Sequence, residues 1–103
     1  MPTSNGELHL FLLKADGLVR CRWDGNSERV EILDRALNGE TVRELVRDPF
    51  RRNRLYAATL TEIHVSEDGG ETWQWLPSGG LDYRDIWTMA VHPTRPDEIF
   101  VGT

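Results

Sequence analysis

Ser66-Glu67-Asp68-Gly69-Gly70-Glu71-Thr72-Trp73 is the stretch of this 103-residue chain that says most about its fold. Its centre, Asp68-Gly69-Gly70, is a turn signal between two strand-like runs, Glu62–Ser66 and Thr72–Leu76. Glycine adopts the positive φ angles that tight turns require, and an aspartate side chain accepts backbone N–H bonds across such a turn. The stretch therefore predicts a β-hairpin, which the apolar ring of Trp73 would anchor on a neighbouring element.

An internal repeat extends this pattern along the chain. The run from Val46 to Thr59 aligns without a gap on the run from Ala90 to Thr103, and its proline recurs 93 − 49 = 44 positions later. Both runs also share an aliphatic–aromatic pair, a small residue and a threonine. Asp24-Gly25 lies the same distance before Asp68-Gly69, so the turn signal is repeated as well. Such self-similarity is the signature of a repeat architecture.

The length of the repeat predicts an all-β fold. A period near 44 residues matches the ~40–50-residue blades of β-propellers, and each blade is a four-stranded antiparallel sheet. We therefore expect one domain over residues 1–103, a partial β-propeller of about two to two-and-a-half four-stranded antiparallel blades. The blade-like repeats are expected at about 7–34, 41–77 and 85–103. The expected strands are Leu8–Lys14, Leu18–Trp23, Glu28–Leu33, Thr41–Asp48, Arg54–Thr59, Glu62–Ser66, Thr72–Leu76, Asp85–His92 and Glu98–Thr103.

One segment permits two predictions. Thr41-Val42-Arg43-Glu44 has the form of a helix capping box, and apolar residues follow it at helical spacing. Read alone, Thr41–Asp48 predicts a helix. The repeat aligns it with Ile86–Val91, whose residues favour a strand, and we give this alignment more weight.

Two-and-a-half blades are fewer than the ~4–8 blades of closed propellers. The chain is therefore expected to be a fragment of a longer protein or an incomplete gene model. Taken alone, its open sheet edges and faces predict self-association or marginal stability.

The opening stretch, Ser66 to Trp73, resembles a motif of a known family. Its S-x-D-x-G-x-T-W pattern resembles the Asp-box, or BNR repeat, of sialidase-type β-propellers, and at the level of repeats the resemblance covers nearly the whole chain. The superfamily includes sialidases, xyloglucan-degrading glycosidases, sortilin-type receptors and photosystem II assembly factors, so the box indicates a fold and leaves the function open. The resemblance implies a turn between the third and fourth strands of a blade, facing away from the usual ligand pocket. It implies a structural role for Ser66, Asp68, Gly70, Thr72 and Trp73.

The same resemblance implies that any ligand pocket lies among the loops Asp34–Glu40, Leu60–Thr61 and Ser78–Arg84. That face is expected to carry carboxylates, a cation, a phenol and an aromatic ring, which are the groups that recognise sugars. Two carboxylates are also the minimum for glycoside hydrolysis, at ~5–5.5 Å or ~6.5–9.5 Å. A polar surface loop, with its arginine paired and its tryptophan packed between blades, is the alternative. The candidate ligand-binding residues are Asp82, Tyr83, Arg84, Asp85 and Trp87.

Two functional hypotheses follow from this loop. The first is a BNR/Asp-box propeller module that binds a carbohydrate or a protein and lacks complete catalytic machinery in this chain. The alternative is a fragment of a sialidase-like or xyloglucanase-like glycoside hydrolase, so enzymatic activity stays open. No sialidase catalytic residue is assigned, because Phe50-Arg51-Arg52-Asn53 lacks the Ile-Pro of the F/Y-R-I-P motif.

The composition limits the kinds of binding partner and the cellular location that we expect. A net charge of −5 argues against nucleic-acid binding, and the short basic run Arg51–Arg54 is expected to be a solvated loop, with contact to an acidic ligand as the alternative. The single cysteine excludes an internal disulfide. The apolar run Leu8–Leu13 is too short to span a membrane, and no charged n-region precedes it, which favours a cytoplasmic protein. No cofactor or metal is expected, since His9, His64 and His92 lie in separate runs.

Overall fold

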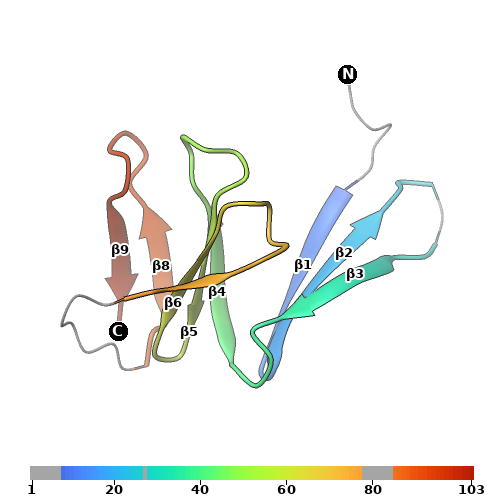
Figure 1. Ribbon diagram of the computed structural model, residues 1–103, viewed down its shortest axis with the longest axis horizontal. Coiled ribbons are helices and arrows are strands. Elements are labelled where there is room, and N and C mark those ends of the chain that lie inside the picture. The colour runs from blue at the N-terminus through green and yellow to red at the C-terminus, as the bar shows by residue number, and fades with distance from the viewer. Residues whose placement is uncertain (1–7, 27, 78–84) are drawn as a thin grey trace.

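The computed structural model describes residues 8–26, 28–77 and 85–103, and this part of the chain is all-β (Figure 1). Its strands form three antiparallel sheets, none of them closed. We call them the first sheet (β1-β2-β3), the middle sheet (β4-β5-β6-β7) and the last sheet (β8-β9). The strands are β1 (Leu8–Lys14), β2 (Gly17–Trp23), β3 (Glu31–Ala36), β4 (Val42–Arg47), β5 (Leu55–Thr59), β6 (Ile63–Ser66), β7 (Gln74–Leu76), β8 (Thr88–Val91) and β9 (Ile99–Gly102).

The sheets stand side by side, with the middle sheet between the other two (Figure 1). Contacts between β4 and β8 join the middle and last sheets, and contacts between β1 and β4 join the first and middle sheets. The buried core lies between the middle and last sheets, because one apolar face of each is turned toward the other. Its members are Tyr56, Ala58, Ile63, Val65, Ile86 and Met89.

The 44-residue period is visible in the strand register. Val46 pairs with Tyr56 in the β4–β5 hairpin, and Ala90 pairs with Phe100 in the β8–β9 hairpin, so each pair is displaced by the same 44 positions. The hairpin loops repeat too. Asp48 N donates to Arg54 O at 2.9 Å, and His92 N donates to Glu98 O at 2.9 Å.

The first residue of each loop, Asp48 in one and His92 in the other, accepts an equivalent hydrogen bond. Asp48 Oδ1 accepts a hydrogen bond from Phe50 N at 2.7 Å, and His92 Nδ1 accepts one from Thr94 N at 3.1 Å. Both are acceptors two residues before the donor, as in an Asx-type turn. An aspartate and a histidine therefore stabilise equivalent turns.

The strand predicted for Thr41–Asp48 is confirmed as β4 (Val42–Arg47), and the helix that its capping box alone predicts does not form. Val42 is buried, and β4 pairs with β5 while also contacting β8. Tertiary pairing on both sides outweighs the local capping signal, which is worth only about 1 kcal/mol.

The third strand of the first sheet lies later than expected, at Glu31–Ala36 instead of Glu28–Leu33. The β2–β3 register shifts between Arg20 and Cys21, and Arg20 then faces Asp34. Their side chains form an ion pair, with Arg20 Nη2 2.8 Å from Asp34 Oδ2. The full box motif is missing from the loop between β2 and β3, and two cross-strand ion pairs, Arg20–Asp34 and Arg22–Glu31, stabilise the observed register.

Candidate functional site

The five residues of the Asp-box bind one another within the turn between β6 and β7. Ser66 Oγ accepts a hydrogen bond from Gly70 N at 2.8 Å and donates to Asp68 Oδ1 at 2.8 Å. The other carboxylate bonds come from Thr72, whose backbone N lies 2.9 Å from Oδ1 and whose Oγ1 lies 2.5 Å from Oδ2. Trp73 Nε1 donates to Gly70 O at 3.2 Å. The side chains of Ser66, Asp68 and Thr72 thus all form hydrogen bonds within the turn.

The electrostatics of Asp68 fit this structural role. Hydrogen bonds from the Thr72 hydroxyl, the Thr72 backbone N–H and the Ser66 hydroxyl lower the pKa of Asp68 to about 2. A carboxyl group with this pKa stays ionised at neutral pH and is a poor proton donor. Because its pKa in the folded state lies below the ordinary 3.8, the stabilisation it provides is present above that value and is lost as the pH falls toward 2.

The box turn also touches the first sheet. Gly70 has a φ of 98°, and a Cβ atom placed on it would lie 2.8 Å from Cε1 of Phe11 on β1. Trp73, expected to anchor the turn on a neighbour, is only half-buried, and the polar contact of its ring is with Gly70 O. The absence of a side chain at Gly70 therefore lets the first and middle sheets approach.

Gly70→Ala is expected to lower the free energy of unfolding by about 2–5 kcal/mol. A left-handed backbone costs a non-glycine residue about 1–2 kcal/mol, and overpacking against Phe11 adds about 1–3 kcal/mol. Gly69→Ala is the matched control, since Gly69 has a φ of 75° but nothing within 4 Å of its Cβ position. Urea unfolding of both variants measures the difference. Equal losses would show that the contact with Phe11 carries no energy.

A network of charges lies at the same edge as the box turn. Arg54 Nη1 is 3.2 Å from Glu67 Oε2, and Arg51 pairs with Asp97 of the β8–β9 hairpin. Gly69 N donates to Asn53 O at 2.8 Å, which joins the box turn to the β4–β5 hairpin. In the basic run, Arg51 and Arg54 therefore bind acidic groups of this chain.

The opposite edge carries the connections between β1 and β2, β3 and β4, and β5 and β6 (Figure 1). Backbone hydrogen bonds join neighbouring connections there: Gly39 N donates to Asp16 O at 2.8 Å, and Ile86 N donates to Leu60 O at 2.9 Å. Asp85–Trp87 therefore lies at the edge away from the box turn, among the connections between strands.

The structure places only part of the predicted ligand-binding loop, because Asp82, Tyr83 and Arg84 lie outside the described residues. Asp85 is exposed, with a φ of 52°. Trp87 is 64% exposed instead of packed between sheets, and the guanidinium carbon of Arg43 lies 4.3 Å from the centre of its ring. This distance is typical of a cation–π contact.

Arg43 is the residue that the sequence reasoning missed. It lies 44 positions before Trp87, so the two occupy equivalent places beside the first strands of successive repeats. Since β4 contacts β8, equivalent positions on these strands are neighbours in space. The repeat alignment contained this signal, since it sets Arg43 opposite Trp87.

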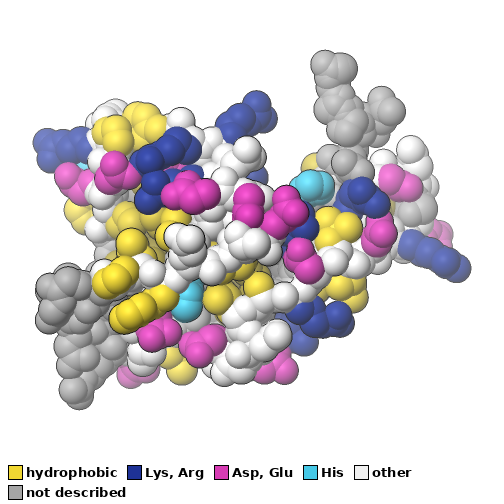
Figure 2. Space-filling view, in the orientation of Figure 1, with side chains coloured by type: hydrophobic (Ala, Val, Ile, Leu, Met, Phe, Trp, Pro, Cys, Tyr) yellow, Lys and Arg dark blue, Asp and Glu magenta, His cyan; other side chains and the backbone are white. Residues whose placement is uncertain are grey.

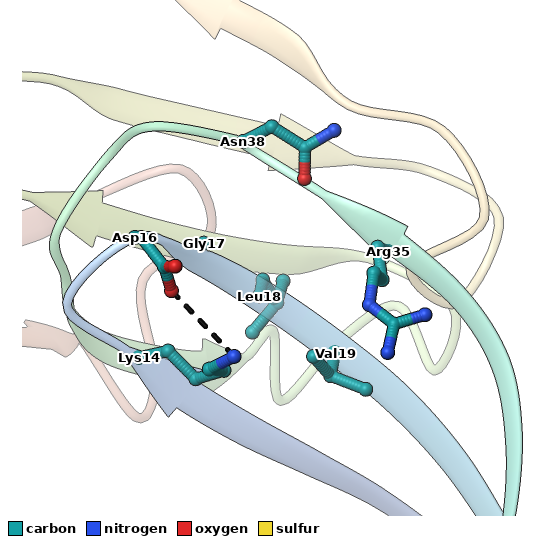
Figure 3. A pocket seen from close by; sticks show the side chains of 7 residues that line it. All are labelled: Lys14, Asp16, Gly17, Leu18, Val19, Arg35 and Asn38. Carbon is teal, nitrogen blue, oxygen red and sulfur yellow. Dashed lines mark ion pairs between the residues drawn. The ribbon is translucent and has the colours of Figure 1, made fainter.

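Two hollows occur elsewhere in the described part of the chain. One, of about 90 Å³, lies at the first sheet, where Figure 3 shows Lys14 and Arg35 on either side of Val19. The other, an open cleft of about 260 Å³, lies between the first and middle sheets and is lined by His9, Phe11, Leu45, Val46, Arg47 and Leu55. Neither includes Asp85 or Trp87 among its lining residues.

Within residues 8–26, 28–77 and 85–103, no group of three His, Cys, Asp or Glu side chains could hold a metal ion. The same residues contain no helix long and apolar enough to cross a membrane.

Comparison with known proteins gives no family assignment. No protein-family model matches the chain, and no curated protein matches it.

Proposed function

We propose that this chain is part of a BNR/Asp-box propeller and acts as a ligand-binding module, with a carbohydrate as the ligand. The observation that carries the proposal is the exposed ring of Trp87, held by Arg43 at the edge opposite the box turn. An indole face that is open to solvent stacks on the apolar face of a pyranose ring, while guanidinium and carboxylate groups bind its hydroxyls.

Three features support the propeller. The box turn lies between the third and fourth strands of a four-stranded meander, β4-β5-β6-β7. The β4–β5 hairpin recurs 44 residues later as β8–β9 with the same register. The sheets pack face to face in chain order, as blades do. In this proposal the three sheets are the blades of the repeats expected at about 7–34, 41–77 and 85–103.

A binding surface agrees with the described residues better than a catalytic pocket does. Catalysis requires a concave site and an acid or base whose pKa suits proton transfer. Asp48 and Asp68 have pKa values below the ordinary range of a carboxyl group, and both lie at the edge of the sheets that carries the box turn. A glycoside hydrolase would need a second carboxyl group near Asp85, and the candidate for that role, Asp82, lies outside the described residues.

Trp87→Ala is expected to weaken carbohydrate binding about ten-fold or more, since the contact area lost with an indole is worth more than 1.4 kcal/mol. The measurement is a screen on a glycan array, followed by calorimetric titration of the glycans retained. Trp75→Ala is the matched control, because Trp75 is 59% exposed on β7, outside the proposed site. Arg43→Met tests the cation separately.

Equal binding by the wild type and both tryptophan variants would exclude the Trp87 surface. Release of reducing sugar by the wild type would instead favour the hydrolase.

A further inference from the structure

The first sheet has an apolar face turned away from the middle sheet. Leu10, Cys21 and Ile32 lie in one row across its three strands, and the next rows bring Leu8 beside Trp23 and Leu12 beside Val19. Phe11, on the opposite face, contacts the middle sheet at Gly70. We call the outward side the back face. The large apolar residues of its outer strands are exposed, with fractions of 49% for Leu8, 38% for Leu10, 54% for Leu12 and 50% for Ile32, whereas Val19 and Cys21 on the central strand are buried.

The corresponding faces of the other sheets are covered. The pair Leu55–Ser66 of the middle sheet lies 45 positions after the pair Leu10–Cys21 of the first sheet, so the two pairs are equivalent. Leu55 therefore lies on the back face of the middle sheet, and so does Ala57, two residues along the same strand. Leu55 is 3% exposed and lines the cleft against the first sheet, while Ala57 is fully buried. In the last sheet, Met89 and Val101 face the middle sheet in the core. Each of these back faces therefore packs on the sheet before it.

The opposite, front faces carry one aromatic residue in each repeat. Phe11 of β1 meets the box turn of the middle sheet, and Tyr56 of β5 is 1% exposed in the core against the last sheet. Phe100 of β9 occupies the equivalent place, 44 positions after Tyr56, and is 54% exposed. It pairs with Ala90 on the front face of the last sheet, which no described sheet covers. Figure 2 shows apolar side chains reaching the surface over both outer sheets.

We propose that the front face of the last sheet docks on the back face of the first sheet of a second copy, so that two copies form a head-to-tail dimer. At the two junctions within the chain, the front face of one sheet packs against the back face of the next sheet. The two uncovered faces are one front face and one back face, so they can pair in the same way. The contact is heterologous, since two different patches meet, and such contacts close into a ring when the rotation permits.

The number of sheets is consistent with a ring of two. Each copy supplies three sheets, so a dimer holds six, within the range of about 4–8 for closed propellers. A ring buries the back and front faces of both copies and leaves none of these four apolar faces in water. This stoichiometry rests on the propeller proposed above, whereas the pairing of the two faces rests on the repeat geometry alone.

Sedimentation velocity and light scattering of the 103-residue chain test the dimer. The wild type is expected at twice its mass of 11.8 kDa. Leu10→Asp on the back face and Phe100→Asp on the front face should each raise the dissociation constant at least about 100-fold, because a carboxylate would be buried without a partner. Leu13→Asp is the matched control, since Leu13 lies on the same strand with the same 38% exposure but on the other face.

Mixing the two blocked variants identifies the head-to-tail arrangement. One junction of the mixed pair joins an unaltered front face to an unaltered back face, so dimers should reappear in the mixture but not in either variant alone. Far-UV circular dichroism confirms that each variant is folded. A monomeric wild type at 100 µM overturns the proposal, as does a Phe100→Asp variant that dimerises like the wild type, which would mean that like faces pair. Mass is measured without a glycan, so this result is independent of carbohydrate binding.

Discussion

Tyr56→Ala is expected to lower the free energy of unfolding by about 3–5 kcal/mol, the usual cost of removing a large aromatic side chain from a core. Tyr56 is 1% exposed and packs with Ile63, Ile86 and Met89 between the middle and last sheets. Its loss leaves a cavity at the junction that joins two repeats. The measurement is urea unfolding followed by circular dichroism.

Tyr56→Phe separates the ring from the hydroxyl group. The hydroxyl lies 3.5 Å from Asp48 Oδ2, a long hydrogen bond, so its loss should cost about 1 kcal/mol or less. A loss for the alanine variant no larger than that for the phenylalanine variant would contradict the placement of Tyr56 at the centre of the core.

Asp48→Ala is expected to cost about 3–5 kcal/mol, because it removes a buried charge with several partners. Asp48 is 1% exposed, and its carboxylate accepts from Phe50 N and lies 3.3 Å from Arg51 Nε. Without it, Phe50 N loses its acceptor, and the buried Nε of Arg54, which makes no hydrogen bond, loses the nearby negative charge at 3.9 Å.

The chain supplies its own control for this variant. Asp48→His copies the equivalent loop, where His92 accepts the same hydrogen bond, so the turn should be kept while the ion pairs are lost. Its cost is expected to lie between those of the wild type and Asp48→Ala. Equal stability of the histidine variant and the wild type at pH 7 would mean that the charge of Asp48 is unimportant.

The pH dependence follows from the pKa of Asp48. Burial raises this pKa, but the hydrogen bond from Phe50 N and the charges of Arg51 and Arg54 outweigh burial, so the pKa lies below 3.8. The stabilisation is therefore fully present above about pH 4 and is lost as the pH falls through the folded-state value. The difference between the wild type and Asp48→His should shrink over the same interval.

Much of the fold was predictable because it depends on local signals and on the repeat. The Asp-Gly-Gly turn gave the β6–β7 hairpin, and the 44-residue alignment gave strand β4 despite its helical pattern. The position of β3 was not predictable, since it depends on Arg20 meeting Asp34 across two strands. No local pattern encodes a register that a cross-strand ion pair sets.

The candidate site was predictable only in part. The resemblance to Asp-box propellers predicted that Asp85 and Trp87 lie at the edge away from the box. The contact with Arg43 depends on which strands become neighbours when sheets stack, which is a property of the tertiary structure. The charge network of Asp48, Arg51 and Asp97 was missed for the same reason, since it joins hairpins from two repeats.

The stacking of the three sheets has a consequence for how this protein loses its structure. The middle sheet is supported on both sides, whereas the first and last sheets each rest on a single neighbour. In such an array the stability is close to a sum of repeat and nearest-neighbour terms. In the monomer, the outer sheets can therefore open one at a time while the middle hairpins hold, so the backbone amides of β5 and β6 should exchange last.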